Sequence, residues 1–284
     1  MPLLRPMQRP RAGLLAASAV LAVIVAVAIL APWISPDDPF VQHLAERRIP
    51  PVWHAWFWND PRAGWAHPLG TDKVGRDTLS RLLFGARISL LVGGVTAAVS
   101  TMIGGVLGTV AGYLGGRVDL AASFLIQARL ALPVILVALT TVAVFGGSLA
   151  MLVVVLSLLL WDRAAVMTRS ATSQLRTLEF VQAARALGCS DLRIILTGIL
   201  PNLLGGLAVI ATIELGNAVL LEAALSFLGL GVRPPSPSWG LMLAEGKDDI
   251  FFAPWAITIP GTALFLLVLS TSVIGNAVQA GDGG

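Results

Sequence analysis

Charged residues are scarce in this chain. Asp, Glu, Lys and Arg make up 12% of its 284 residues, about half the share of a soluble domain, whereas 56% of the residues are hydrophobic. The net charge is only +3, and no basic block marks a nucleic-acid footprint. The composition therefore indicates a membrane protein surrounded by lipid and argues against a nucleic-acid partner.

Cysteine and histidine are also rare. Cys189 is the single cysteine, which excludes an internal disulfide framework, and we interpret it as a small packing residue. The histidines, His43, His54 and His67, lack the paired spacing of a metal site. We therefore predict neither a metal nor a cofactor bound by this chain.

Catalytic motifs are missing as well. The chain has no Gly-x-x-x-x-Gly-Lys-Ser/Thr phosphate loop, no Gly-x-Ser-x-Gly elbow and no His-Glu-x-x-His zinc helix. A membrane-embedded enzyme would need a converging nucleophile and base or a metal set, and none is visible. We predict that the chain is not an enzyme, and that any ATP it depends on is bound with Mg²⁺ by a separate subunit.

Six apolar runs are present, and most reach the length of about 20 residues that spans a bilayer. They cover about Gly13–Ile34, Ile88–Tyr113, Leu120–Phe145, Ser148–Trp161, Asn202–Leu228 and Ala256–Val278. A cleaved signal peptide is the alternative for the first run, but that run continues into Pro32 and Trp33 without a convincing cleavage site. The predicted fold is an all-α membrane protein with six transmembrane helices, the third of them kinked at Pro133.

The distribution of arginine predicts the orientation. Cytoplasmic segments are rich in positive charge, and six spans place both termini on one side. Arginines gather at Arg5, Arg9, Arg11, Arg117 and from Arg163 to Arg193. We therefore place both termini in the cytoplasm and divide the chain into 1–34, an extracytoplasmic loop over 35–87, and a five-helix core over 88–284. Tryptophans in that loop, Trp53, Trp56, Trp58 and Trp65, favour contact with lipid headgroups.

Small and polar residues inside the spans suggest packing and pathway sites. Gly104, Gly108 and Gly112 recur at four-residue intervals and predict a smooth strip for another helix. Carboxylates at bilayer depth are costly, so Glu214 is a candidate for the translocation pathway, together with Gln127. Helix–helix hydrogen bonding or snorkelling is the alternative for Gln127 and for Arg129, and we assign Glu222 a structural role near the outer end.

A polar, amphipathic island separates two apolar runs at Glu179–Asn202. Its periodicity predicts two short helices joined by a bend at Gly188, with Ser190 capping the second helix and Pro201 ending or kinking it. Such a bent hairpin suits a knob that inserts into a partner's groove. The residues that we assign to this coupling loop, over 177–201, are Glu179, Phe180, Gln182, Ala183, Ala184, Leu187, Gly188, Asp191, Leu200 and Pro201.

The same island resembles the cytoplasmic EAA loop of ABC importer permeases. Ala183, Ala184, Gly188 and the Leu200–Pro201 pair match that pattern in register. Gln182 replaces the glutamate of the family pattern, which removes any ion pair made at that position.

Two further segments resemble the C-type subunit of the dipeptide, oligopeptide and nickel branch. One is His67–Leu91, where we expect Thr71 to start an interfacial helix on the outer side. In that helix one face is apolar and the other carries Arg76, Asp77 and Arg81. The other segment is Ser226–Gly240, whose prolines predict a rigid external lip.

The resemblance implies a permease subunit of an ATP-driven importer in the bacterial inner membrane, forming half of a pathway for di- and oligopeptides. It implies a second homologous permease subunit, two ATPase subunits or one fused ATPase, and an extracytoplasmic solute-binding protein. Nickel or another small solute is an alternative cargo. An ion-coupled secondary transporter is a third reading, but beyond Glu214 the chain shows no obvious internal repeat.

Overall fold

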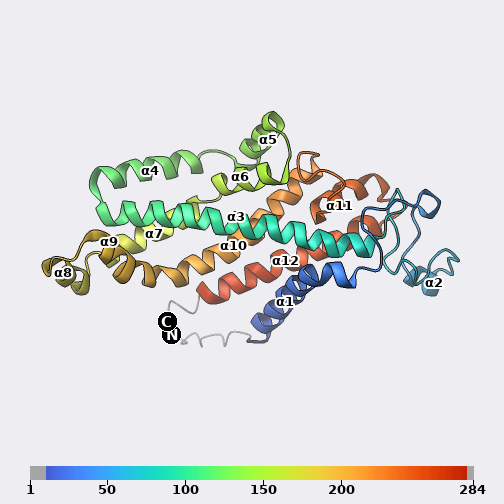
Figure 1. The fold of residues 1–284 in the computed structure, drawn as a ribbon, viewed down its shortest axis with the longest axis horizontal. Coiled ribbons are helices and arrows are strands. Elements are labelled where there is room, and N and C mark those ends of the chain that lie inside the picture. Colours follow the sequence, from blue (N-terminus) through green and yellow to red (C-terminus); the bar gives the residue numbers. More distant parts are fainter. Residues whose placement is uncertain (1–10, 280–284) are drawn as a thin grey trace, which may run out of the picture.

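The computed structural model describes residues 11–279, and in that range the regular structure is helical (Figure 1). Long helices lie side by side along the longest axis, with α8 and α9 at one end and α2 at the other. The helices are α1 (Arg11–Ile34), α2 (Trp53–Phe57), α3 (Thr78–Leu114), α4 (Gly116–Leu130), α5 (Val134–Phe145), α6 (Leu149–Leu159), α7 (Asp162–Leu175), α8 (Glu179–Ala186), α9 (Asp191–Ile194), α10 (Leu200–Phe227), α11 (Trp239–Gly246) and α12 (Trp255–Gln279).

Within residues 11–279, five stretches are long and apolar enough to cross a membrane. They are Ala12–Ile34, Thr78–Leu114, Leu149–Leu175, Asp191–Phe227 and Trp255–Val278. The predicted third span is instead broken into α4 and α5, which are bent by 82°. Pro133 lies at the break as the N-cap of α5, where its ring and missing N–H prevent the helix from continuing. The number of spans is six only if this bent pair counts as one.

The prediction of an interfacial helix starting at Thr71 is wrong. Thr71 and Asp77 pair across a tight turn, and α3 begins at Thr78 and continues without interruption into the span. Asp77 is the actual N-cap, because its carboxylate accepts a hydrogen bond from the Ser80 N–H at 2.7 Å. Gly75 holds the turn at φ +79°, where a Cβ would lie 1.9 Å from the His43 carbonyl oxygen.

Arg76, Asp77 and Arg81 also do not form an exposed polar face. Arg76 and Arg81 are buried with Asp72 and Glu245 in what we call the outer ion cluster, made of these four residues. The Arg81 side chain is 2% exposed, and its Nη1 lies 2.7 Å from Asp72 Oδ2 and 2.6 Å from Glu245 Oε2. The cluster joins the start of α3 to α11.

The glycine strip of α3 lies against α7. A Cβ on Gly104 would approach the Trp161 carbonyl oxygen to 2.1 Å, and one on Gly112 would approach the Arg169 carbonyl oxygen to 2.5 Å. The chain continues as a helix beyond the fourth apolar run, and one face of α7 is buried against α3. Only glycine permits this close backbone approach.

We expect Gly108→Ala to destabilise the fold by about 1–3 kcal/mol, the usual cost of overpacking. A Cβ at Gly108 would lie 2.2 Å from Thr168 Oγ1 and 2.3 Å from the Ala165 carbonyl oxygen, so α3 and α7 must separate. Gly94→Ala is the matched control, because no atom lies within 4 Å of its Cβ on the same helix. Thermal unfolding in detergent measures both variants, and equal midpoints would contradict the tight α3–α7 contact.

Candidate coupling surface and polar pathway residues

The predicted hairpin at 179–199 is present as α8, a glycine turn and α9. Gly188 adopts φ +77° directly after α8. The Cys189 N–H donates to the Ala184 carbonyl at 3.1 Å, and the Gly188 N–H donates to the Arg185 carbonyl at 3.0 Å. This pair of bonds is a Schellman motif, in which a left-handed residue satisfies the last carbonyls of a helix. The bend therefore depends on a backbone conformation that glycine adopts without strain.

Val181 anchors the hairpin and was missed by the sequence reasoning. It is fully buried and packs in one cluster with Tyr113, Ile194, Ile199 and Leu203. Leu187, which we had assigned to the coupling loop, is 84% exposed. Val181 and Ala184 lie three residues apart, and that spacing was the available signal for the buried face.

Several large apolar side chains of the hairpin are exposed. We call this group the coupling tip, and it consists of Phe180, Leu187, Leu192 and Leu196. Around it, Glu179, Gln182 and Ala183 are also exposed, whereas Ala184 is partly covered. Exposed apolar clusters of this kind mark surfaces that bind a partner. Figure 1 places α8 beyond the end of α3, with α9 beside that end.

Tyr113 ties the hairpin to the end of α3. Its hydroxyl donates to Asp191 Oδ1 at 2.6 Å, and the Arg185 guanidinium lies 5.4 Å from its ring centroid. Ser190 occupies the predicted N-cap position of α9, but its side chain makes no capping hydrogen bond. The hydrogen bond from Tyr113 to Asp191 therefore holds the α8–α9 hairpin against the end of α3.

Pro201 does not end the second helix. A π-helical turn over Ile195–Ile199 connects α9 to α10, and Pro201 lies in the first turn of α10, where no intrahelical N–H is needed. The wider turn accommodates the proline, so the hairpin continues directly into a 28-residue helix.

Glu214 is buried in the middle of α10. It is 1% exposed, and its Oε1 lies 3.6 Å from Arg163 Nη1 while Asn217 Nδ2 lies 3.4 Å from its Oε2. Gln127 is exposed on α4 and does not join this group. The structure brings only one of the two pathway candidates into a polar cluster.

Arg129 does not extend towards headgroups. Its Nη2 lies 3.4 Å from Asp162 Oδ1, and its side chain is largely buried. Asp162 and Arg163 are the first two residues of α7. The Arg129–Asp162 and Glu214–Arg163 ion pairs therefore lie at the same end of that helix. These two pairs link α4 and α10 to α7.

Glu222 connects the C-terminal end of α10 to α11. Its Oε1 accepts hydrogen bonds from Ser226 Oγ at 2.7 Å and Ser238 Oγ at 2.8 Å, and the residue is fully buried. Ser238 also caps α11 by accepting from the Leu241 N–H. The structural role that we assigned to Glu222 stays a prediction, which these hydrogen bonds support.

The family comparison covers most of the helical core. Residues 104–281, more than half of the chain, match the family described as binding-protein-dependent transport system inner membrane component. The chain belongs to this family. Residues 13–51 of the permease also match the N-terminal TM domain of oligopeptide transport permease C.

Curated relatives extend the match to nearly the whole permease. It is 41% identical over 257 residues to the dipeptide transport system permease protein DppC of Escherichia coli strain K12, covering 90% of this chain and 84% of that one. It is 37% identical over 258 residues to the di/tripeptide transport system permease protein DppC of Pseudomonas aeruginosa, covering 90% and 83%.

The fold of the permease also resembles a solved transporter. The inward-facing MetNI methionine ABC transporter contains a chain that matches with a TM-score of 0.57 and 21% identity, covering 71% of the permease and 96% of that chain. At this identity the likeness concerns the fold alone.

Family membership has direct consequences for the permease. It is an inner-membrane permease subunit, and it works with an ATPase and a substrate-binding protein.

Proposed function

We propose that the permease forms half of the translocation pathway of an ATP-driven importer of di- and oligopeptides. The observation that carries this proposal is the 41% identity over 257 residues to a dipeptide transport permease. The arginine-rich segments support cytoplasmic placement of both termini and of the α8–α9 hairpin. A second, homologous permease subunit would supply the other half of the pathway as a heterodimer.

The coupling tip would receive the ATPase, with ATP and Mg²⁺ bound on that partner. Its four exposed apolar side chains lie on a hairpin that Val181 and the Tyr113–Asp191 hydrogen bond hold against α3. Because α9 continues through the π-helical turn into α10, ATPase closure would move Glu214 together with the tip. The coupling tip and Glu214 would thereby take part in the same conformational change.

Reconstituted uptake tests this function. The assembled complex in proteoliposomes, supplied with its solute-binding protein, should accumulate labelled dipeptide with internal ATP and not without it. Uptake of nickel in place of dipeptide would contradict the proposal that peptides are the substrate. Uptake on an ion gradient without ATP would instead support a secondary transporter.

Glu214→Gln should lower peptide uptake by about tenfold, which corresponds to roughly 1.4 kcal/mol. The change removes the charge facing Arg163 while it preserves the size of the side chain. Glu222→Gln is the control, because it makes the same change on the same helix and an amide oxygen can still accept from Ser226 and Ser238. Equal uptake by Glu214→Gln and wild type would return Glu214 to a purely structural role.

A further inference from the structure

An acidic pocket of about 460 Å³ lies on the outer side, between the end of α1 and the start of α3. We call it the outer carboxylate pocket, and its polar lining consists of Asp37, Asp38, His43, Glu46, His67 and Asp77. These residues come from the segment after α1, from the loop that follows α2 and from the N-cap of α3. Their sequence separation explains why histidine spacing predicted no metal site.

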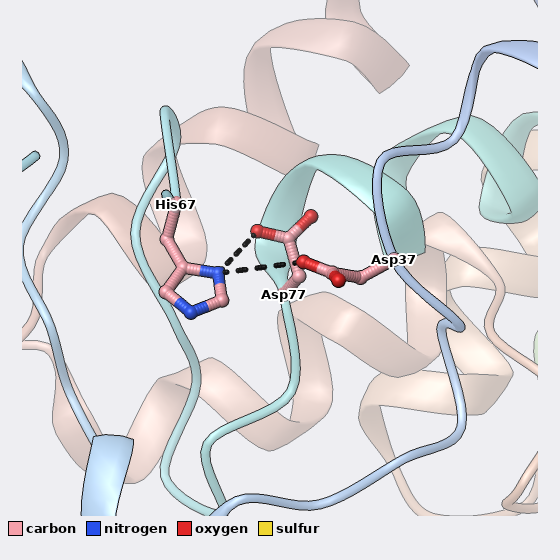
Figure 2. A group of neighbouring side chains, drawn as sticks. All are labelled: Asp37, His67 and Asp77. Carbon is pink, nitrogen blue, oxygen red and sulfur yellow. Dashed lines mark hydrogen bonds and ion pairs between the residues drawn. The ribbon is translucent and has the colours of Figure 1, made fainter. Parts of the chain in front are cut away.

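Three side chains in the pocket converge on one point. In Figure 2 the imidazole Nδ1 of His67 faces carboxylate oxygens of both aspartates. It lies 2.9 Å from Asp77 Oδ1 and 3.8 Å from Asp37 Oδ2, and the three ligand atoms all lie within 4.8 Å of one another. For an ion about 2.1 Å from both Nδ1 and Asp77 Oδ1, the angle between the two bonds to the ion would be roughly 90°. This angle leaves further coordination positions for water.

The charge in this pocket is unbalanced. No Lys or Arg nitrogen in the described range 11–279 lies within 4 Å of a carboxylate oxygen of Asp37, Glu46 or Asp77. The neighbouring outer ion cluster differs, because there each carboxylate has an arginine partner. Three carboxylates around one imidazole create a strongly negative site that a bound cation would neutralise.

The surroundings of His67 match those of a metal ligand. The residue is only 9% exposed, and its other ring nitrogen, Nε2, lies 3.5 Å from Glu46 Oε2. Metal-binding histidines usually donate their second N–H to a carboxylate, a backbone carbonyl or water, which fixes the tautomer. Without an ion, Nδ1 of His67 lies at hydrogen-bond distance from Asp77 Oδ1, 2.9 Å, and a bound ion would replace that hydrogen bond. Asp77 is prepared in the same way, since its Oδ2 accepts from the Ser80 N–H and Oγ while Oδ1 faces His67.

We propose that Asp37, His67 and Asp77 bind one divalent transition-metal ion, with nitrogen and carboxylate ligands suited to Zn²⁺. The ion joins the segment after α1 and the outer loop to the N-terminus of α3. It acts as a staple for the outer surface, on which the substrate-binding partner must dock.

Zinc binding by the full-length chain in detergent tests this site. The protein is stripped with a chelator, the chelator is removed, and bound Zn²⁺ is measured by equilibrium dialysis. Wild type should bind one equivalent. Asp37→Asn and His67→Gln should each weaken binding by at least about tenfold. Asp37 is half-exposed, so its substitution leaves the fold intact and keeps the test valid even if His67→Gln unfolds.

Asp60→Asn is the matched control, because it also removes a carboxylate from this outer loop. The Asp60 carboxylate pairs with Arg62 and lies outside the proposed site. This variant should bind Zn²⁺ like wild type. Failure of wild type to bind a single equivalent, or equal affinity in Asp37→Asn and wild type, would overturn the site. Displacement of Zn²⁺ by an equal concentration of Ca²⁺ would overturn its assignment to transition metals.

Discussion

Gly188→Val should reduce the ATPase that co-purifies with the permease by more than about tenfold, while membrane insertion stays intact. Gly188 adopts φ +77° in the turn between α8 and α9. A left-handed conformation costs an L-residue about 1–2 kcal/mol, and a β-branched side chain makes it worse. The Schellman turn would open, and the four side chains of the coupling tip would no longer present one surface.

Gly188→Asn tests whether backbone strain, and not the bulk of the side chain, causes the loss in Gly188→Val. No atom lies within 4 Å of a Cβ placed on Gly188, so a side chain fits there sterically. Asparagine tolerates the left-handed conformation, and this variant should retain the ATPase. Pull-down of co-expressed ATPase from detergent extracts measures both variants. Full retention in Gly188→Val would count against coupling through this hairpin.

Local signals predicted the hairpin, and distant contacts decided its orientation. The polar island, the glycine and the following proline are neighbours in sequence, so two short helices around a bend could be derived from them. Which face is buried depends on Tyr113 at the end of α3, about 70 residues earlier. The periodicity of 179–187 allows an apolar face through Phe180 and Leu187 as well as one through Val181 and Ala184, and it does not report which of the two meets Tyr113.

The start of α3 shows a similar limit. Thr71 and Asp77 are both acceptable caps, and the choice depends on the tight turn at Gly75, which packs against His43. The burial of Arg81 depends on Glu245, which lies far along the chain. In contrast, the apolar runs were found from sequence because the length of a bilayer-spanning helix is fixed by the thickness of the bilayer.

The charges of the outer ion cluster balance, with two arginines facing two carboxylates. Burial alone would raise the pKa of Asp72, but the cations of Arg81 and Arg76 and the backbone N–H groups of Arg76 and Val74 outweigh it, so the pKa of Asp72 is lowered. A lowered folded pKa gives stability that is complete above the unfolded value, about 3.9, and is lost as the pH falls through the folded value. The outer segment should therefore loosen only under acid conditions below about pH 4.

Arg81→Met should destabilise the fold by about 3–5 kcal/mol, the usual cost of removing one partner from a buried ion pair. The change leaves Asp72 and Glu245 with Arg76 as their shared cation, in a site where the missing guanidinium was 2% exposed. Thermal unfolding in detergent at neutral pH measures the loss. Arg62→Met is the control, because Arg62 pairs with Asp60 on the exposed loop and should leave the midpoint unchanged.

The double variant Arg81→Met, Glu245→Met distinguishes lost charge balance from lost packing. It removes one charge of each sign and keeps the bond from Arg76 to Asp72, at 2.6 Å between Nε and Oδ2. Because apolar residues of similar volume can replace a buried ion pair with little loss, the double variant should be more stable than Arg81→Met alone. If the destabilisations caused by Arg81→Met and by Glu245→Met simply add in the double variant, the cluster stabilises the fold through side-chain packing and not through its balance of charge.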